Sequence, residues 1–377
     1  MPRLDKCLPS LSPRPLLRWW FCVCLAALIN ANAAEAAVIL LYHRVSETGA
    51  ASTRVEPQRF ADHLDLISQQ GYRVMPLLDV LTALRAGVAP PEKTVVITFD
   101  DAYRSVGEVA FPLLKARGMP FTIFAATDIV DAANPHYLSW EALQEMATNP
   151  LVTVGGHSLS HAHLESLDAV AGDLNARDFS GETGRPSAQR GEEVALNMQR
   201  LKQKLGSAVV EAFAYPFGEY SRSTEALLTR LDLAGLAQQS GAIGSATNLT
   251  RIPRFPLHMG ADSDARLLLA LQSKPLEVLS EQPAQIFYPP NTELPATWRL
   301  QPLVLGFSRA AIQCYSSRGN ALPMRWLADD WLEVDLPTLT PGRNKVNCTA
   351  PAQDGSGYFW TSRLWLVADS NGQWLLN

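Results

Sequence analysis

The pattern that most restricts the possible folds is an alternation between short apolar runs and longer amphipathic stretches, which begins at Ala37. The apolar runs are rich in β-branched and aromatic residues, as buried strands are. The amphipathic stretches repeat their apolar residues at helical spacing, and several end at a glycine. This alternation predicts an α/β fold whose parallel strands, joined by helices, form a sheet or barrel. We expect strands over residues 38–42, 94–99, 121–125, 151–154 and 212–215, and helices over 57–70, 110–117, 139–146, 191–205 and 223–231.

A different pattern begins at about residue 270, where prolines become frequent and the helical periodicity disappears. Short strand-like runs follow, separated by turn pairs such as Pro341-Gly342. The change predicts a small all-β, sandwich-like domain over residues 271–377, behind an α/β domain over residues 37–270. The tryptophans of this segment could form a glycan-binding surface, but we favour a role in the packed core. They are Trp298, Trp326, Trp331, Trp360, Trp365 and Trp374.

The first residues have the order of a bacterial export signal. Arg14 and Arg18 precede a short apolar run over residues 19–29, and small residues follow up to Ala36. We therefore expect residues 1–36 to be a signal peptide and the protein to reach the periplasm or the extracellular space. An uncleaved anchor is the alternative, although the run is short for a membrane span. We expect no membrane span in the mature chain.

Charge and cysteine usage narrow the possible partners. The formal net charge is −5, and removal of residues 1–33, which carry +3, would leave −8. An acidic chain without a basic cluster is poorly suited to nucleic acid, so we expect no such partner. Cys314 and Cys348 remain beyond the signal peptide. In an exported protein they are expected to form one disulfide, with two buried free thiols as the alternative.

Two clusters of polar residues follow apolar strands. Asp100 and Asp101 come directly after the expected strand over residues 94–99. At such a strand end, one carboxylate can bind a cation while its neighbour acts as a base, although a solvated loop pair is the simpler alternative. His157 and His161 follow the next-but-one strand, and their spacing would place both imidazoles on one side of a helical turn. That arrangement suits a divalent metal, unless the histidines are there by chance.

Taken together, the clusters predict a catalytic metal site. Asp101, His157 and His161 would provide three protein ligands, which leaves a coordination position open for water. A metal-bound water becomes a usable nucleophile near neutral pH, and Asp100 could accept its proton. Zinc is the first choice for this divalent metal, with cobalt, nickel and iron as alternatives.

These residues resemble the polysaccharide deacetylases that carry the NodB homology domain, carbohydrate esterase family 4. The run from Thr98 to Asp101 matches the family's first motif, and the stretch from His157 to His161 matches its second. The resemblance covers about residues 38–257, and Leu41-Tyr42-His43-Arg44 is similar to the opening strand of the branch that acts on poly-N-acetylglucosamine. It implies a distorted (β/α)7 barrel and metal-dependent removal of acetyl groups.

The third motif of the family matches only in part. Its arginine position holds Ala214, and its tyrosine position holds Phe217, whose backbone N–H the resemblance implies as a donor to the oxyanion. A backbone donor survives a change from tyrosine to phenylalanine. The group that orients Asp100 is left open, and Arg254 could reach it or contact substrate, unless it is a surface residue.

The general acid and the sugar-contacting residues are less defined. His258, in a partial match to the family's late motif, is expected to be the acid that protonates the leaving nitrogen. His43, at the end of the first strand, is the other candidate for this acid or for contact with substrate. Tyr103, Tyr215 and Phe217 could stack on sugar rings, or could simply pack in the core.

The resemblance implies an N-acetylated polysaccharide as substrate, first a poly-N-acetylglucosamine-like exopolysaccharide, then peptidoglycan or chitin oligomers. Other exopolysaccharide-export proteins are candidate partners. Two alternatives stay open. A site of two histidines and one carboxylate also suits non-heme iron oxygenases. The departures at Ala214 and in the late motif would fit an inactive glycan-binding protein.

Overall fold

The computed structural model describes residues 36–165 and 188–370. The described residues belong to one compact unit. The predicted signal peptide lies outside the described residues, apart from Ala36. Across the two described ranges, no helix combines the length and the apolar character needed to cross a membrane.

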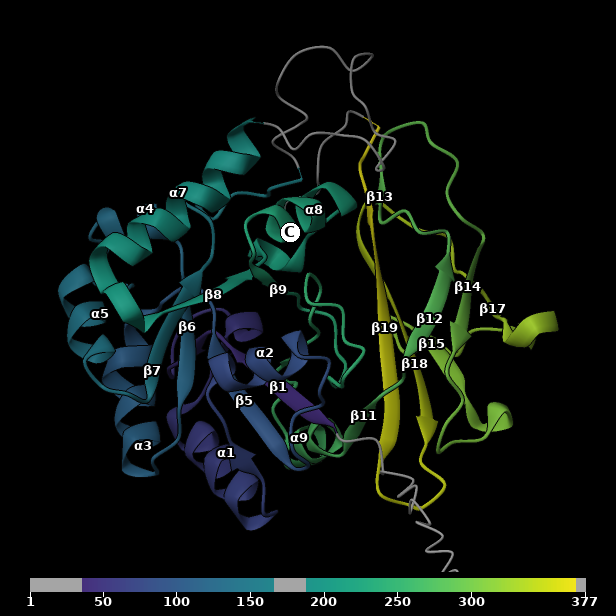
Figure 1. The fold of residues 1–377 in the computed structure, drawn as a ribbon, viewed down its shortest axis with the longest axis horizontal. Coiled ribbons are helices and arrows are strands. Elements are labelled where there is room, and N and C mark those ends of the chain that lie inside the picture. Colours follow the sequence, from purple (N-terminus) through teal and green to yellow (C-terminus); the bar gives the residue numbers. More distant parts are fainter. Residues whose placement is uncertain (1–35, 166–187, 371–377) are drawn as a thin grey trace, which may run out of the picture. The chain divides into compact units, whose positions relative to one another are not determined.

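An eight-stranded parallel sheet dominates the first part of the chain (Figure 1). Its main path has the order β10-β1-β5-β6-β7-β8-β9, and β4 pairs with β5. The strands are β1 (Ala37–Tyr42), β4 (Arg73–Val74), β5 (Thr94–Phe99), β6 (Phe121–Ala125), β7 (Val152–Gly156), β8 (Val209–Ala214), β9 (Ala234–Leu236) and β10 (Phe255–Pro256). This path of seven parallel strands, with helices in most connections, confirms the predicted distorted (β/α)7 fold.

Helices follow most of these strands, and Figure 1 shows α1, α3, α5 and α7 along one side of the sheet. Serine side chains cap three of the helices: Ser139, Ser221 and Ser263 each accept a hydrogen bond from the backbone N–H three residues later. The α-helices are α1 (Pro57–Gln69), α2 (Leu77–Arg85), α3 (Phe111–Ala116), α4 (Thr127–Asp131), α5 (Trp140–Ala147), α7 (Ala188–Leu205), α8 (Arg222–Arg230) and α9 (Asp264–Leu271). Shorter elements are the π-helix η2 (Val106–Ala110), the 3-10 turns η1 (Ala51–Thr53), η3 (Gly206–Ala208) and η4 (Pro216–Gly218), and the paired strands β2 (Arg44–Val45) and β3 (Arg54–Val55).

Apolar residues fill the central strands because both faces of the sheet are covered. On β1, Leu40 belongs to one core with Phe60 of α1, whereas Ile39 belongs to a second core with Leu81 of α2. Side chains alternate between the two faces along a strand. Helices α1 and α2 therefore cover opposite faces of β1, and every position of such a strand is best filled by an apolar residue.

The C-terminal region is β-rich, and it is called the β module below. One sheet has the order β11-β19-β18-β15, with β13 paired to β19, and the other has the order β12-β14-β17-β16. The strands are β11 (Ser273–Pro275), β12 (Val278–Gln282), β13 (Phe287–Tyr288), β14 (Thr297–Pro302), β15 (Gln313–Ser316), β16 (Met324–Trp326), β17 (Leu332–Asp335), β18 (Gly342–Pro351) and β19 (Tyr358–Val367). Two short 3-10 turns are η5 (Arg309–Ala311) and η6 (Ala328–Asp330). The predicted boundary at residue 271 remains a prediction.

The two sheets of the β module share one apolar core. Trp298 of β14 and Trp365 of β19 are fully buried there, with their rings 5.8 Å apart in an edge-to-face arrangement. These two tryptophans therefore pack the core, as we favoured, and offer no surface to a glycan. Cys314 and Cys348 lie opposite each other on β15 and β18 and form a disulfide.

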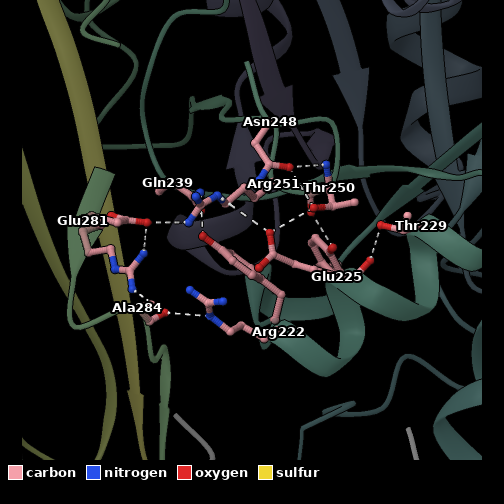
Figure 2. Close-up of polar contacts among 12 residues, drawn as sticks. Arg222, Glu225, Thr229, Gln239, Asn248, Thr250, Arg251, Glu281 and Ala284 are labelled. Carbon is pink, nitrogen blue, oxygen red and sulfur yellow. Dashed lines mark hydrogen bonds and ion pairs between the residues drawn. The ribbon is translucent and has the colours of Figure 1, made fainter. Parts of the chain in front are cut away.

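Charged side chains connect the β module with the loop after β9 and with α8 (Figure 2). Glu281 of β12 accepts a hydrogen bond from Arg251 at 2.8 Å and also pairs with Arg363 of β19. Arg222 of α8 donates to the carbonyl oxygen of Ala284 at 3.1 Å. Burial alone would raise the pKa of Glu281, but the two arginines outweigh it and lower that pKa, so the carboxylate is ionised.

Candidate metal centre and active site

The chain turns sharply after β5, and this turn sends two neighbouring carboxylates in different directions. Asp101 and Ala102 have φ angles of 72° and 55°, in the left-handed region that residues other than glycine rarely adopt. Such strain persists where the surrounding structure imposes it, and it is concentrated at functional sites. As a result, Asp100 faces Arg254 while Asp101 faces the two histidines.

The end of β7 places His157 in a closely packed position. A Cβ on Gly155 would lie 2.4 Å from the ring of Phe124, and one on Gly156 would lie 2.6 Å from Oδ1 of Asn197. Two glycines are therefore needed for the backbone to pass here. The N–H of His157 donates to Oδ1 of Asn197 at 3.1 Å.

A backbone contact also sets the orientation and tautomer of the buried His157 ring. Its Nδ1 lies 2.7 Å from the carbonyl oxygen of Ala214, so Nδ1 carries the proton. In the neutral ring, Nε2 then presents a lone pair on the opposite side. This outer contact is the kind that orients metal-binding histidines and raises their basicity.

His161 joins the site through a loop and not through the helical turn that we predicted. Residues 157–163 are not helical, and Ser158 and His161 both have positive φ angles, of 65° and 60°. The N–H of His161 donates to Oγ of Ser158 at 2.9 Å. Glu193 of α7 accepts hydrogen bonds from both the N–H and the hydroxyl of Ser160, at 3.0 and 2.8 Å. These bonds hold the loop in place of helical periodicity.

Asp101, His157 and His161 form a triad that fits a metal ion. Oδ1 of Asp101 lies 3.2 Å from Nε2 of His157 and 3.1 Å from Nε2 of His161, and the three ligand atoms lie within 4.8 Å of one another. Among the described residues, this buried Oδ1 receives no hydrogen bond. In the neutral form of His157, the Nε2 lone pair faces this carboxylate oxygen, and a cation between the two atoms would replace that repulsion with two attractive contacts.

Asp100 forms a buried ion pair with Arg254. The guanidinium makes two hydrogen bonds of 2.7 Å to the two carboxylate oxygens, and both side chains are 0% exposed. Arg254 also donates to the carbonyl oxygen of Ala237 at 2.8 Å and to Oγ1 of Thr98 at 3.2 Å. Burial would raise the pKa of Asp100, but Arg254 and His157 outweigh it and lower that pKa, so the carboxylate is ionised.

Phe217 lies on the η4 turn after β8 and borders the triad. Its φ angle of 58° and ψ angle of 4° place a bulky residue in the left-handed region. The ring meets His161 edge-on, with centroids 4.6 Å apart, and stacks on His163 at 3.8 Å. The ring of Phe217 therefore packs against the histidine side of the triad.

In the order of the strands, the position of His43 is nearer to Asp100 and Asp101 than the position of His258 is. Residue 43 directly follows β1, where Tyr42 pairs with Phe99, so its neighbour across the sheet is Asp100. Burial lowers the pKa of His43, and the charges of Asp101 and Asp100 oppose that change in part. His258 follows β10, which lies on the far side of β1 from β5. Its Nδ1 is 3.1 Å from the carbonyl oxygen of Met259.

Burial argues against substrate contact for two of the predicted residues. Tyr215 is 0% exposed and its hydroxyl donates to the carbonyl oxygen of Thr250, so its ring has no face for a sugar. Arg254 is equally buried and acts on Asp100. Tyr103 is 9% exposed, and its ring stacks on Tyr137 at 4.9 Å, which leaves little of it for a ligand.

The sequence reasoning missed the groups that hold His157. Asn197 lies on the apolar side of α7, three residues after Val194 and one before Met198, and all three are buried. A polar residue at such a position of an amphipathic helix indicates a buried hydrogen bond. The contribution of Ala214 is a backbone oxygen, which no side-chain motif can reveal.

Comparison with known proteins agrees with this site. Residues 87–236 match the family model described as polysaccharide deacetylase. YxkH of Bacillus subtilis (strain 168), which is named as a polysaccharide deacetylase, is 27% identical over 49% of this chain and 58% of its own length. The poly-beta-1,6-N-acetyl-D-glucosamine N-deacetylase of Escherichia coli (strain K12) is 24% identical over 58% of this chain and 36% of its own. The chain thus spans less than two thirds of either curated relative.

A solved structure supports the same assignment. IcaB from Ammonifex degensii superposes with a TM-score of 0.52 and 25% identity, over 63% of this chain and 98% of that one. The segment matched by the family model contains both carboxylates, both triad histidines and Phe217. Residues 87–236 of this chain therefore match the polysaccharide deacetylase family, and the curated relatives and the solved structure agree with that match.

Proposed function

We propose that the protein removes acetyl groups from an N-acetylated polysaccharide outside the cytoplasm, with a poly-N-acetylglucosamine-like exopolysaccharide as the first candidate substrate. The observation that carries the proposal is the convergence of Asp101, His157 and His161 beside an ionised Asp100. The name of the Escherichia coli relative supports the choice of glycan. The predicted signal peptide supports export.

The triad would hold a divalent cation, and its two imidazole nitrogens and one carboxylate oxygen suit zinc. Such a cation would polarise the acetamido carbonyl and lower the pKa of water in the site. Cobalt, nickel and iron accept the same ligands and are the alternatives.

The chain's own groups would move the protons and bind the reacting oxygen. Asp100 accepts a proton from the attacking water at a carboxylate oxygen that Arg254 keeps ionised and oriented. A carboxylate with a lowered pKa is a weak base, so this proton transfer requires a water molecule whose own pKa has been lowered. The N–H of Phe217 binds the carbonyl oxygen as negative charge develops there. Acetate and a free amine are the products.

We assign proton donation to the leaving nitrogen to His43, in place of the predicted His258. His43 is next to Asp100 across β1 and β5, whereas His258 follows β10 and is separated from Asp100 by β1. The proton that His43 gives to nitrogen as the C–N bond breaks balances the proton that Asp100 takes from water. A histidine with a lowered pKa is a stronger acid in its protonated form.

The position of Arg254 weakens the alternative of an inactive glycan-binding protein. That alternative rested in part on the alanine at the family's arginine position. A guanidinium reaches Asp100 from the segment before β10 instead, with two bonds of 2.7 Å. The charge that a working site needs beside Asp100 is therefore present.

Acetate release from a panel of N-acetylated glycans tests the proposal. The panel contains poly-N-acetylglucosamine, chitin oligomers and peptidoglycan, and each is assayed before chelation, after it, and after zinc is added back. We expect turnover that needs the metal, and its loss in His157→Ala with an unchanged circular dichroism spectrum. Binding without turnover would favour the inactive alternative, and dependence on oxygen would favour an oxygenase. Full turnover by His157→Ala would refute the mechanism.

A further inference from the structure

Strand β18 of the β module reaches the turn that carries Phe217. Nη1 of Arg343 donates to the carbonyl oxygen of Phe217. Two residues later on the same face of β18, Nζ of Lys345 lies 3.4 Å from the carbonyl oxygen of Gln238. Residue 238 follows β9, as residue 217 follows β8. One face of β18 thus contacts the loops at the carboxyl ends of two neighbouring strands of the parallel sheet.

A second contact of Arg343 belongs to a group of residues around Phe217. Its Nε lies 3.9 Å from Oε1 of Glu219, which is 5% exposed. The other oxygen of Glu219 lies 2.7 Å from Nδ1 of His163. The ring of His163 stacks on the ring of Phe217 with an angle of 2° between their planes. Phe217 is therefore held at its carbonyl by Arg343 and at its ring by His163.

The backbone of Phe217 needs such support. A φ angle of 58° is unfavourable for a residue with a Cβ, and it persists only where neighbours impose it. The next residue, Gly218, lies so close to Gln238 that a Cβ would come within 2.6 Å of that side chain. The turn is thus supported by Gln238 on one side and by Arg343 on the other.

We propose that Arg343 is a positioning residue for the deacetylase site. By binding the Phe217 carbonyl, it fixes the peptide group that follows Phe217 and so holds the turn in the conformation that presents the Phe217 N–H to the substrate oxygen. The β module thus supports the active site. This inference rests on the proposed function, which gives that N–H its role. A hydrogen-bond donor in an active site stabilises the transition state more strongly when its position is fixed before the reaction.

The test compares variants of the full chain by steady-state acetate release. Arg343→Ala should lower kcat by about 10- to 30-fold with KM nearly unchanged, which is less than the ~100- to 1000-fold expected for loss of an oxyanion donor itself. Added guanidinium should restore part of the loss. The matched control is Arg251→Met, which breaks the contact with Glu281 without touching the Phe217 turn. It should lower the melting temperature and leave kcat unchanged.

Each of three kinetic results would overturn the inference. They are an unchanged kcat in Arg343→Ala, an equal loss in Arg251→Met, and a higher KM with normal kcat, which would indicate direct contact between Arg343 and the glycan. Hydrogen exchange of residues 215–220 gives a readout that needs no turnover. It should accelerate in Arg343→Ala and stay slow in Arg251→Met, and unchanged exchange in both would also overturn the inference. A wild-type chain that releases no acetate would instead count against the proposed function.

Discussion

Replacement of Arg254 by methionine tests the buried ion pair on which the site depends. The change keeps most of the side-chain length and its apolar contacts, and removes the guanidinium. Asp100 would lose two hydrogen bonds of 2.7 Å in a place where neither side chain has exposed surface. Two further acceptors, on Thr98 and Ala237, would lose their donor.

The expected cost follows from the complete burial. Removal of one partner from a buried ion pair leaves an uncompensated charge and typically destabilises a protein by about 3–5 kcal/mol. Arg254 is also a main reason why the pKa of Asp100 lies below its usual range. Stability from a lowered carboxylate pKa is present above the unfolded value of about 3.9 and is lost as pH falls through the folded value. In Arg254→Met, the guanidinium no longer opposes the effect of burial, so the pKa of Asp100 rises and its carboxyl group binds a proton already in mild acid. The deficit should therefore be large at pH 7 and smaller near pH 4.

Urea unfolding of a double-mutant cycle measures this effect. The variants are Arg254→Met, Asp100→Asn and the two combined, each unfolded at pH 7 and again near pH 4. Each single change should lose about 3–5 kcal/mol, and the combined change should lose at least about 2 kcal/mol less than their sum. Acetate release by Arg254→Met should fall by about 100-fold, because Asp100 is no longer oriented. Additive losses, or a deficit that does not change with pH, would refute the buried pair.

Three further predictions concern other parts of the molecule. Asn197→Ala should weaken zinc binding by about 10- to 100-fold in a chelator competition, because the backbone of the His157 loop loses its acceptor; equal affinity would contradict this support. Cys314→Ser with Cys348→Ser should cost about 4 kcal/mol in calorimetry, given the sequence separation of 34 residues, and an unchanged stability would speak against the entropic model. His43→Gln should lower kcat by about 100-fold or more and remove the alkaline limb of the pH profile, where the wild type loses its acidic proton. If His258→Gln had that effect instead, the acid assignment would be reversed.

The strands that carry the site could be predicted because each is a continuous apolar run. The run expected over residues 94–99 is β5, and the one expected over residues 38–42 differs from β1 by a single residue. Apolar residues on both faces leave little ambiguity about such a strand. The polar residues after each run then had to meet at one edge of the sheet, which brought Asp101 to the two histidines.

The pattern of apolar runs could not identify Arg254 as the partner of Asp100. Arg254 lies 154 residues further along the chain, and its contact depends on the pairing of β10 with β1. Strand β10 has only two residues, too few to show a periodic pattern. The spacing of His157 and His161 correctly predicted that the two rings lie together, but the predicted helical turn was wrong. Hydrogen bonds from backbone N–H groups to side chains shape that loop instead. Helices α2, α4 and α9 were not predicted, although the buried residues of α2, Leu77, Val80, Leu81 and Leu84, follow helical spacing.

The arginine position of the third motif shows why chemistry is better compared in space than in sequence. A buried carboxylate that acts as a base needs a positive charge beside it to stay ionised, whichever segment of the chain provides that charge. Here Ala214 stands at the motif position, and its carbonyl oxygen fixes the tautomer of His157. The guanidinium comes from Arg254, which directly precedes β10, the strand that pairs with β1. The site requires an ionised Asp100 and an oriented His157, and different groups meet these two requirements. The site therefore keeps a positive charge beside Asp100 although the motif position holds no arginine.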